Sequence, residues 1–402
     1  MTQTVATAQP IEEPAVATRT TPAVLGSYEE AIERARAIAP AFQARATQTE
    51  QLRRLPTESV RELLASGLLG LLTPRHYGGS ELNLESVIDA VGEIAGACGS
   101  TGWVYMLWTA HMWLLALWPE AAQDEFWHNP NSLASSVVNT TGTPERVPGG
   151  FRWTGRGFFS SGVDHCNWLT AALNVPRDDG PPERLWMLIP RQDFTIVDDW
   201  HTVGLKGTGS KTIIVDDAFI PTYRTLRQVD SDEGTSDGAR IHPNPQYGVS
   251  SSTIFGIPVA APSIGIARTF MHAYEARLRP KLNMTDAGLA MDQGATVVRY
   301  TTALTQVDAA RALLMENARR FSRTPANQVS RADRARCRRD HAFAAQSARK
   351  AVNLLWEEAG GSSLFESTDM QRLWRDANAA AAHHGLGWDW QAITWGKIAL
   401  GL

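Results

Sequence analysis

The sequence predicts an α+β protein in which two helical regions flank a β-rich middle region. Residues 27–128 and 241–402 place apolar side chains at three- and four-residue spacing, the period of an amphipathic helix. Residues 129–240 instead contain short β-branched and aromatic runs separated by Gly and Pro, which is typical of strands. Helices kept apart from a sheet layer in this way define the α+β class.

Length and composition exclude several kinds of protein. The 402 residues suffice for two or three domains, and 38 basic against 42 acidic residues leave a net charge of −4. A chain without a strong positive field is not expected to bind nucleic acid. The three cysteines lie far apart without a C-x-x-C motif, which excludes a disulfide framework and a cysteine zinc site and favours a reducing cytoplasm. The 14 Trp against 7 Tyr suggest aromatic-lined cavities.

The N-terminal region begins with a predicted disordered tail. Residues 1–26 are rich in Thr, Ala and Pro and lack an apolar segment. We expect helices at residues 28–46, 57–64, 84–97 and 99–118 in the domain that spans 27–128. The last contains the most apolar run, residues 103–118, which His111 interrupts. It is shorter than the roughly 20 residues of a membrane span, so we expect a buried helix and no membrane partner.

The middle region, residues 129–240, predicts a barrel-like β-domain. We expect strands at residues 151–159, 168–175, 184–189, 194–197 and 212–215. Residues 231–245 follow as a polar, Gly- and Pro-containing stretch that predicts a linker or mobile loop.

The C-terminal region, residues 241–402, predicts a four-helix bundle. Its expected helices are residues 257–279, 286–322, 330–359 and 369–385, and their Ala-rich faces allow close packing. Five arginines lie between residues 331 and 339, but Asp333 and Asp340 are interleaved with them. We interpret this run as a solvated or interface face of a helix and not as a nucleic-acid site.

Two short motifs in the middle region have polar side chains at strand ends. In residues 159–165, FSSGVDH, a Ser, an Asp and a His are close in sequence, but the G-x-S-x-G elbow of hydrolases is missing. From spacing alone we reject a hydrolase triad and favour a strand-end turn that uses Ser161 and Gly162 for backbone reasons. Residues 204–211, GLKGTGSK, match neither a P-loop nor a Rossmann fingerprint, so they are either an anion-binding turn or a β-turn.

Histidines supply the remaining candidates. Arg375, Ala379 and His383 are spaced four apart and are expected on one helix face, where His383 could exchange a proton near neutral pH. Adjacent His383 and His384 point apart on a helix, so we expect no metal site; a helix that ends on histidines is the alternative. His111 is either a polar group in an aromatic pocket or a satisfied core histidine.

Taken together, these segments resemble the acyl-CoA dehydrogenase fold superfamily, and more closely its branch of flavin-dependent monooxygenases. These are oxygenase components of two-component aromatic hydroxylases. The resemblance extends from about residue 28 to the C-terminus. The matching stretches are residues 68–79 (LLGLLTPRHYGG), 98–127, 158–168 (FFSSGVDHCNW), 203–221 (VGLKGTGSKTIIVDDAFIP) and 360–383.

The resemblance implies roles for individual residues. Ser161 would contact the flavin or its peroxide, and His383 would lie near the reactive C4a edge, where it protonates the leaving oxygen or deprotonates a phenol or an indole N–H. The implied flavin-binding set is Ser161, Gly162, Gly207, Thr208, Ser210 and His383. The implied substrate pocket is Trp103, Trp108, His111 and His384, and His111 joins Ser161 and His383 as a catalytic candidate.

One departure separates the branches of the superfamily. Many acyl-CoA dehydrogenases have Tyr-Glu-Gly after a helix with Arg-Asp, and the Glu is the catalytic base. Counted from Arg375 and Asp376, this chain has His383-His384-Gly385, so a histidine takes the Glu position. Residues 261–270, where other dehydrogenases carry the base, also lack a carboxylate. Dehydrogenation of a thioester would have no proton acceptor.

The resemblance therefore implies an oxygenase component that uses reduced FAD or FMN and O2. A C4a-hydroperoxyflavin would hydroxylate a phenolic, indolic or polycyclic small molecule. A separate NAD(P)H:flavin reductase would supply the reduced flavin, and the chain would form a homotetramer. The alternatives are an N-oxygenase acting on an amino sugar, an acyl-CoA dehydrogenase with an unusual base, and a flavin-binding scaffold without turnover.

Overall fold

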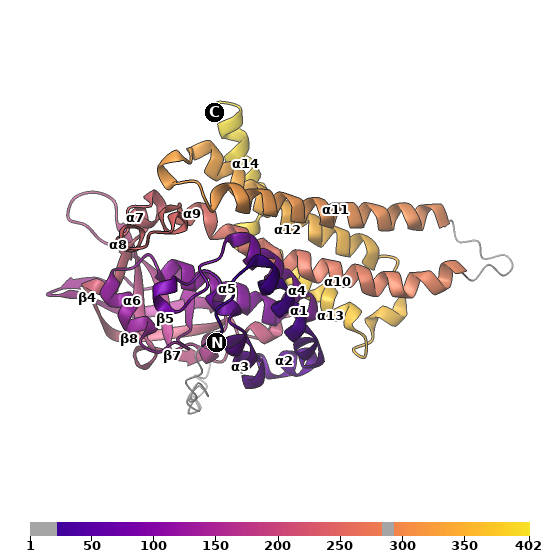
Figure 1. The fold of residues 1–402 in the computed structure, drawn as a ribbon, viewed down its shortest axis with the longest axis horizontal. Helices are drawn as coiled ribbons and strands as arrows, with labels where there is room; N and C mark the ends of the chain where they lie inside the picture. Colours follow the sequence, from indigo (N-terminus) through magenta and orange to yellow (C-terminus); the bar gives the residue numbers. More distant parts are fainter. Residues whose placement is uncertain (1–21, 284–292) are drawn as a thin grey trace, which may run out of the picture.

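The computed structural model describes residues 22–283 and 293–402. Figure 1 shows the strands on one side of the molecule, the long helices of the C-terminal region on the other, and the N-terminal helices between them. This arrangement confirms the predicted α+β class. Residues 1–21 of the expected tail and the first part of the helix expected at 286–322 lie outside the described residues.

The N-terminal region contains six helices among the described residues. They are α1 (Tyr28–Ala44), α2 (Ala46–Leu52), α3 (Thr57–Ser66), α4 (Leu84–Ala97), α5 (Gly99–Leu115) and α6 (Glu120–Trp127). Side chains of Ser27 and Asn83 accept backbone N–H groups in the first turns of α1 and α4, which fixes both starts. The end of the expected tail is packed, because Leu25 is buried and its N–H donates to Ser80 Oγ at 2.9 Å.

The middle region consists of two sheets. One has the strand order β1-β5-β6-β9, and the other has β2-β4-β8-β7 with β3 paired to β4. The strands are β1 (Ala134–Val137), β2 (Asn139–Thr140), β3 (Glu145–Val147), β4 (Gly150–Ser160), β5 (Trp168–Val175), β6 (Glu183–Pro190), β7 (Thr195–Val197), β8 (Lys211–Pro221) and β9 (Thr225–Arg227). Trp153 of β4 and Leu185 of β6 belong to one apolar cluster between the sheets.

The expected barrel is wrong in detail, although the five predicted strands are confirmed. No strand pairing joins the two sheets within the described residues, so they stack face to face instead of closing. The edge strands β2 and β7 have only two and three residues, which leaves little backbone for pairing with the other sheet. Within its own sheet, β4 bends along β8 at two register shifts, one between Trp153 and Gly155 and another between Gly157 and Ser160. The second irregularity lies directly before Ser161.

The linker predicted at residues 231–245 is folded. It includes the end of α7 (Gln228–Glu233), all of α8 (Asp237–Ile241) and the first residue of a 3₁₀ turn, Pro245–Gly248. The N–H of Gly238 donates to Leu117 O at 3.2 Å, and Trp113 Nε1 donates to Gln246 O at 3.1 Å. These bonds satisfy polar groups at the C-terminal end of α5, and they hold a segment whose composition alone suggested mobility.

The C-terminal region packs α10 (Gly256–Asn283), α11 (Gln293–Phe321), α12 (Arg331–Trp356) and α13 (Asp369–Ala380) into the predicted bundle. The alanines of α12 face inward, as the Ala-rich pattern predicts. The stretch Ser251–Pro280 has the length and composition of a membrane-crossing helix, but 78% of its most apolar window is buried inside the fold. We therefore interpret it as a core helix of the bundle.

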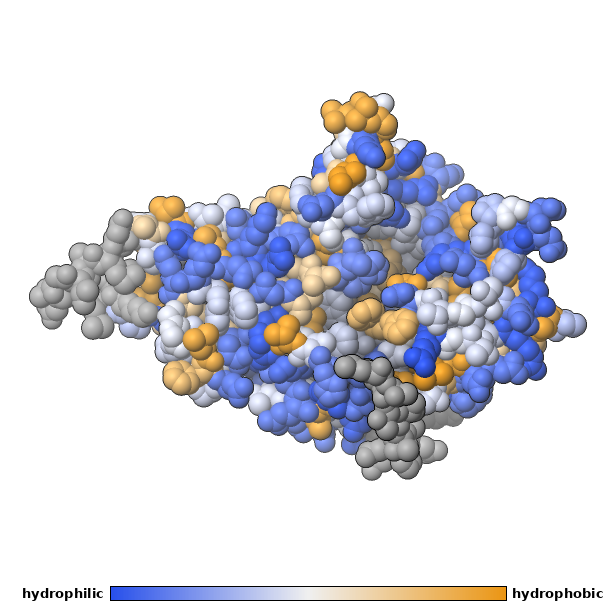
Figure 2. Space-filling model, turned by 180° about the vertical axis from the view of Figure 1, so that it is seen from behind, coloured by the Kyte–Doolittle hydropathy of each residue, from blue (hydrophilic) through white to orange (hydrophobic). Residues whose placement is uncertain are grey.

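A further helix, α14 (Trp388–Ala399), was not predicted and projects from the bundle (Figure 1). Figure 2 shows hydrophobic residues gathered on this projection. Trp390 is 72% exposed and Leu400 is 76% exposed. These side chains have no covering layer in the isolated chain.

Candidate active site

Three hydroxyl side chains come together beside α5, where β4 ends and β8 begins. We call Ser161, Thr208 and Ser210 the hydroxyl cluster. Ser161 Oγ lies 2.7 Å from Ser210 Oγ, and Ser210 Oγ lies 2.7 Å from Thr208 Oγ1. Trp103 Nε1, from α5, donates to Ser161 Oγ at 3.3 Å. Four residues predicted as site residues from three distant segments are thus in contact.

The loop that carries Thr208 and Ser210 is fixed from three directions. Its Leu205 N–H donates to Asp376 Oδ1 of α13 at 2.7 Å, and its Gly207 N–H donates to Ser100 Oγ of α5 at 3.1 Å. Thr208 O accepts the N–H of Gly162 at 2.8 Å. The N–H groups of Gly162 and Gly207, which could have bound an anion, are therefore used in hydrogen bonds inside the protein. Both glycines act here by holding the backbone.

Gly162 is required by the conformation of its turn. Its φ is +71°, and a Cβ at this position would lie 2.9 Å from the ring of Trp108. Trp108 is fully buried, and its Nε1 donates to Cys166 Sγ at 3.2 Å. Trp108, predicted as a pocket wall, is therefore enclosed by protein, and its ring supports the turn of Ser161 by packing against Gly162.

Asp376 was not predicted as a site residue. Burial raises the pKa of its carboxyl to about 6. A Cβ added at Gly99 would lie 2.7 Å from Asp376 Oδ2, so this carboxylate is close to the N-terminus of α5 as well as to Leu205. Its place directly after Arg375 was the only sequence signal, and that signal did not reveal the partner.

A buried ion pair lies beside the hydroxyl cluster. Lys211 Nζ is 2.7 Å from Asp164 Oδ1 and 3.3 Å from Asp198 Oδ1. His165 Nε2 is bonded to Leu55 O at 2.9 Å and not to Ser161. Because Asp164 and His165 have other partners, Ser161 is not the nucleophile of a hydrolase triad.

His383 lies beyond the end of α13, which corrects the expected helix through residue 385. The helix ends at Ala380, because the following residues enter a turn. The half-buried His383 ring lies 5.6 Å from the Trp103 ring, centroid to centroid. Burial, with a smaller effect of His384, lowers the pKa of His383 to about 4. His384 itself is exposed, with its ring 4.4 Å from that of His383.

The hydrogen bonds of His383 determine its tautomer. Gly385 N–H donates to His383 Nδ1 at 3.2 Å, so Nδ1 is an acceptor. A neutral imidazole then carries its proton on Nε2. His383 can therefore present an N–H donor at neutral pH.

His111 has the opposite arrangement. Its Nδ1 lies 2.7 Å from Ala134 O, which can only accept, so the proton is on Nδ1. Its Nε2 is buried and has no hydrogen-bond partner. Burial lowers the pKa of His111 to about 4, so this nitrogen is an open acceptor at neutral pH. The ring of Phe255 stacks on His111 at 5.9 Å.

One face of α5 connects the two histidine environments. Trp103, Leu107 and His111 follow at four-residue spacing, which places them along one side of the helix. Leu107 is the one residue of α5 that is not buried. Phe255 could not be predicted as a neighbour, because it reaches His111 from the start of the bundle.

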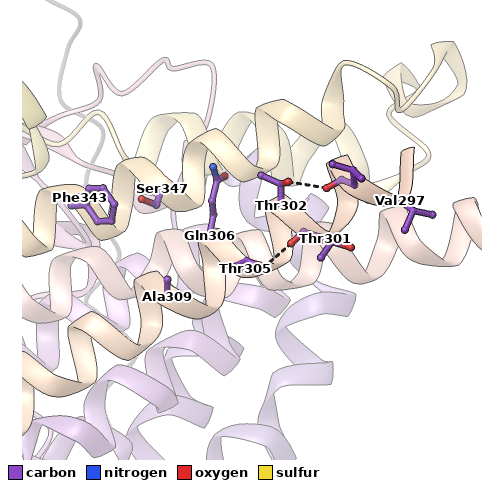
Figure 3. Close-up of a pocket in the computed structure, with 9 residues that line it drawn as sticks. Val297, Thr301, Thr302, Thr305, Gln306, Ala309, Phe343 and Ser347 are labelled. Atoms are coloured by element: carbon purple, nitrogen blue, oxygen red, sulfur yellow. Dashed lines mark hydrogen bonds between the residues drawn. The ribbon is translucent and has the colours of Figure 1, made fainter. Parts of the chain in front are cut away.

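A separate hollow lies on the outside of the bundle, between α11 and α12 (Figure 3). It has a volume of about 520 Å³. Its lining is Val297, Val298, Thr301, Thr302, Thr305, Gln306, Ala309, Phe343 and Ser347. None of the predicted site residues is among them.

The hydroxyl cluster and His383 suit a flat heterocycle with both donors and acceptors. The residue Ser161 is 5% exposed, its Oγ has capacity for one more hydrogen bond, and His383 has a free N–H. The aromatic side chain of Trp103 lies between them. These residues fit the edge of a flavin.

The fold and this site define a flavin-dependent enzyme of acyl-CoA dehydrogenase architecture. Two family profiles match, the acyl-CoA dehydrogenase N-terminal domain over residues 28–131 and the C-terminal domain over residues 257–388. The chain belongs to this family, and the relatives described next place it in the branch of flavin-dependent monooxygenase oxygenase components.

Three proteins illustrate the similarity. The oxygenase component of an FADH2-dependent resorcinol hydroxylase from Rhizobium is 33% identical, with 95% of this chain and 96% of the relative covered. HsaA, the oxygenase subunit of a flavin-dependent monooxygenase from Rhodococcus jostii, is 35% identical over 88% of this chain and 93% of the relative. The crystal structure of a 3-HSA hydroxylase from Rhodococcus superposes with a TM-score of 0.88, at 34% identity over 93% of this chain and 97% of the other.

Proposed function

We propose that this chain hydroxylates a phenol-like aromatic compound as the oxygenase component of a two-component monooxygenase. The observation that carries the proposal is the unpartnered Nε2 of His111, a buried acceptor held neutral by its low pKa. A buried acceptor without a partner is costly, so a ligand that supplies an O–H or N–H group is favoured there. Resorcinol, the substrate in the name of one relative, carries such groups.

His111 would act on the substrate hydroxyl. By accepting the phenolic proton at Nε2, it would increase electron density on the ring and so favour attack by the ring on an electrophilic oxygen. The Nδ1–H bond to Ala134 O keeps the acceptor nitrogen in place. Because Phe255 lies over His111, an entering aromatic ring must displace or stack on Phe255.

The hydroxyl cluster and His383 would hold the cofactor. Bound reduced flavin supplies the electrons with which O2 is activated. Ser161 Oγ would accept a hydrogen bond from the flavin. His383 would hold a proton on Nε2 and donate it to the oxygen atom of O2 that is not transferred to the substrate. Trp103, between these groups, would exclude water from the reacting edge.

Two partners belong to the proposal. The relatives are named oxygenase components or subunits, which supports a separate reductase that supplies reduced flavin.

The exposed apolar side chains of α14 and the hollow of Figure 3 support assembly into a homotetramer. Light scattering should give four times the chain mass of 44.0 kDa, and a monomer would contradict this part. A cytoplasmic location stays a prediction.

The proposal is tested by supplying reduced FAD and O2 with a phenol and, separately, with its methyl ether. The ether has the same ring but no proton for His111. We expect hydroxylated product from the phenol and mainly H2O2 with the ether. Equal yields from both would contradict the role of His111. If no compound in a panel of phenols and indoles gave product, the proposed function would be contradicted.

A further inference from the structure

The hydrogen bonds of the hydroxyl cluster have a fixed direction. Thr208 Oγ1 lies 2.9 Å from Leu205 O, Ser210 Oγ lies 2.7 Å from Thr208 Oγ1, and Ser161 Oγ lies 2.7 Å from Ser210 Oγ. Each distance is that of an O–H···O hydrogen bond, so each needs one proton between its two oxygens. Three hydroxyl groups supply three protons for three contacts.

The carbonyl at one end decides where every proton lies. Leu205 O also accepts the N–H of Thr208 and the Nε1–H of Trp200, both at 3.2 Å, and it has no proton to give, so at 2.9 Å the Thr208 hydroxyl donates to it. Thr208 Oγ1 then accepts from Ser210, because its single proton is used. By the same reasoning Ser210 Oγ accepts from Ser161. The chain of donors therefore runs from Ser161 through Ser210 and Thr208 to the Leu205 carbonyl.

This direction leaves Ser161 without a proton for a ligand. Its hydroxyl proton points to Ser210, and one of its lone pairs takes the N–H of Trp103. The remaining lone pair is the only hydrogen-bonding capacity that Ser161 Oγ retains. Toward a bound molecule, Ser161 is thus an acceptor and not a donor.

Flavin changes its own hydrogen-bonding character with its redox state. In reduced flavin, N5 carries a hydrogen and can donate. In oxidised flavin, N5 has only a lone pair and can accept but not donate. An acceptor fixed opposite N5 makes a hydrogen bond with the first form and opposes the second.

We propose that Thr208 sets the redox preference of the site, because it orients the Ser161 hydroxyl so that reduced flavin binds more tightly than oxidised flavin. This inference rests on the proposed function, in which Ser161 accepts a hydrogen bond from the flavin, and it adds that the flavin atom opposite Ser161 is N5. Leu205 anchors the donor chain, since its N–H is bonded to Asp376 and its position is therefore fixed. Thr208 is a positioning residue that acts through Ser210 on Ser161. An oxygenase that receives reduced flavin and must release oxidised flavin needs this preference.

The test compares dissociation constants for FAD in its two redox states. Oxidised FAD is titrated aerobically, and dithionite-reduced FAD is titrated by calorimetry under anaerobic conditions, so turnover is not required. We expect wild-type protein to bind reduced FAD at least about tenfold more tightly, the effect of one hydrogen bond gained against one mismatched pair.

Thr208→Val removes the hydroxyl but keeps the branched shape. Ser210 can then donate to Ser161, and Ser161 is free to donate to oxidised N5, so the ratio of the two dissociation constants should fall about tenfold. Thr208→Ser restores a hydroxyl and should restore the wild-type ratio. If Thr208→Val does not fold, Ser210→Ala tests the same point. In that variant the Ser161 hydroxyl has no internal acceptor and is free to donate to oxidised flavin, so the ratio of the two dissociation constants should fall.

The outcomes separate the two claims. A Thr208→Val or Ser210→Ala protein with the wild-type ratio would overturn the inference, as would wild-type protein that binds both redox states equally. Wild-type protein that binds neither redox state would overturn the proposed flavin function and this inference with it.

Discussion

The two ends of the α5 face that carries Trp103, Leu107 and His111 treat their polar groups differently. Near Trp103, every hydroxyl proton of the cluster is used in a hydrogen bond inside the protein, and Ser161 Oγ keeps one open lone pair. At His111, two turns further along the same helix, the protein satisfies Nδ1 but leaves Nε2 without a partner. One end is organised before any ligand arrives, whereas the other is incomplete until a ligand binds.

This difference teaches how a site can serve two molecules. A cofactor that must be held in one orientation is suited to a rigid network, whose cost is met when the chain folds. A substrate is better selected by an unpaired group, because a molecule without the matching donor leaves that group buried and unsatisfied. The tautomers agree with this division, since His383 offers a donor on the cofactor side and His111 an acceptor on the substrate side.

The largest expected effect comes from breaking the support of the organised end. Lys211→Met leaves the Asp164 carboxylate buried without its cation, and Asp164 Oδ2 already lacks a hydrogen bond. Removing one partner of a buried ion pair costs about 3–5 kcal/mol of unfolding free energy. Urea unfolding measures the loss, and Arg152→Met, from an exposed ion pair, is the matched control with an expected loss below about 1 kcal/mol. Equal losses in both variants would remove the distinction.

The next effect separates the two ends by function. In His111→Asn, the amide N–H can still donate to Ala134 O, but no acceptor replaces Nε2. We expect product formation from a phenol to fall about 10²-fold, the lower range for losing a general base, with little change in the affinity for reduced FAD. Product yield per flavin oxidised and the FAD dissociation constant are the measurements. A variant that lost FAD binding in parallel would show that the two ends are not independent.

The sequence predicted some of these elements closely. The expected bounds of α4 and β5 agree with the structure, because apolar periodicity and flanking turn residues define both ends. The serine-rich β1 was missed, since its burial depends on pairing with β5 and not on its own composition. Ser161 and Ser210 could be named individually, but their contact spans 49 residues and depends on how the loop is anchored to Asp376.

A smaller effect concerns the dependence of stability on pH. The pKa of His111 is about 4 in the folded chain against 6.5 in the reference state, so the unfolded chain takes up a proton first as pH falls. Stability is therefore lost as pH decreases from about 6.5 toward 4. Between pH 7 and pH 5, wild-type protein should lose about 2 kcal/mol more than His111→Asn, which has no such group to protonate. Urea unfolding at the two pH values gives the comparison, and parallel losses would place His111 in a more polar environment.

The smallest effect tests whether the organised end depends on its weakest bond. Trp103→Phe removes the N–H that donates to Ser161 Oγ at 3.3 Å but keeps an aromatic ring beside His383. A long neutral hydrogen bond contributes about 0.5–1.5 kcal/mol, so the affinity for reduced FAD should change about two- to tenfold. Because the proton of Ser161 still points to Ser210, the preference for reduced over oxidised FAD should remain. If Trp103→Phe lowered that preference as much as Thr208→Val, the direction of the Ser161 hydroxyl would be set by Trp103 and not by the chain of hydroxyls.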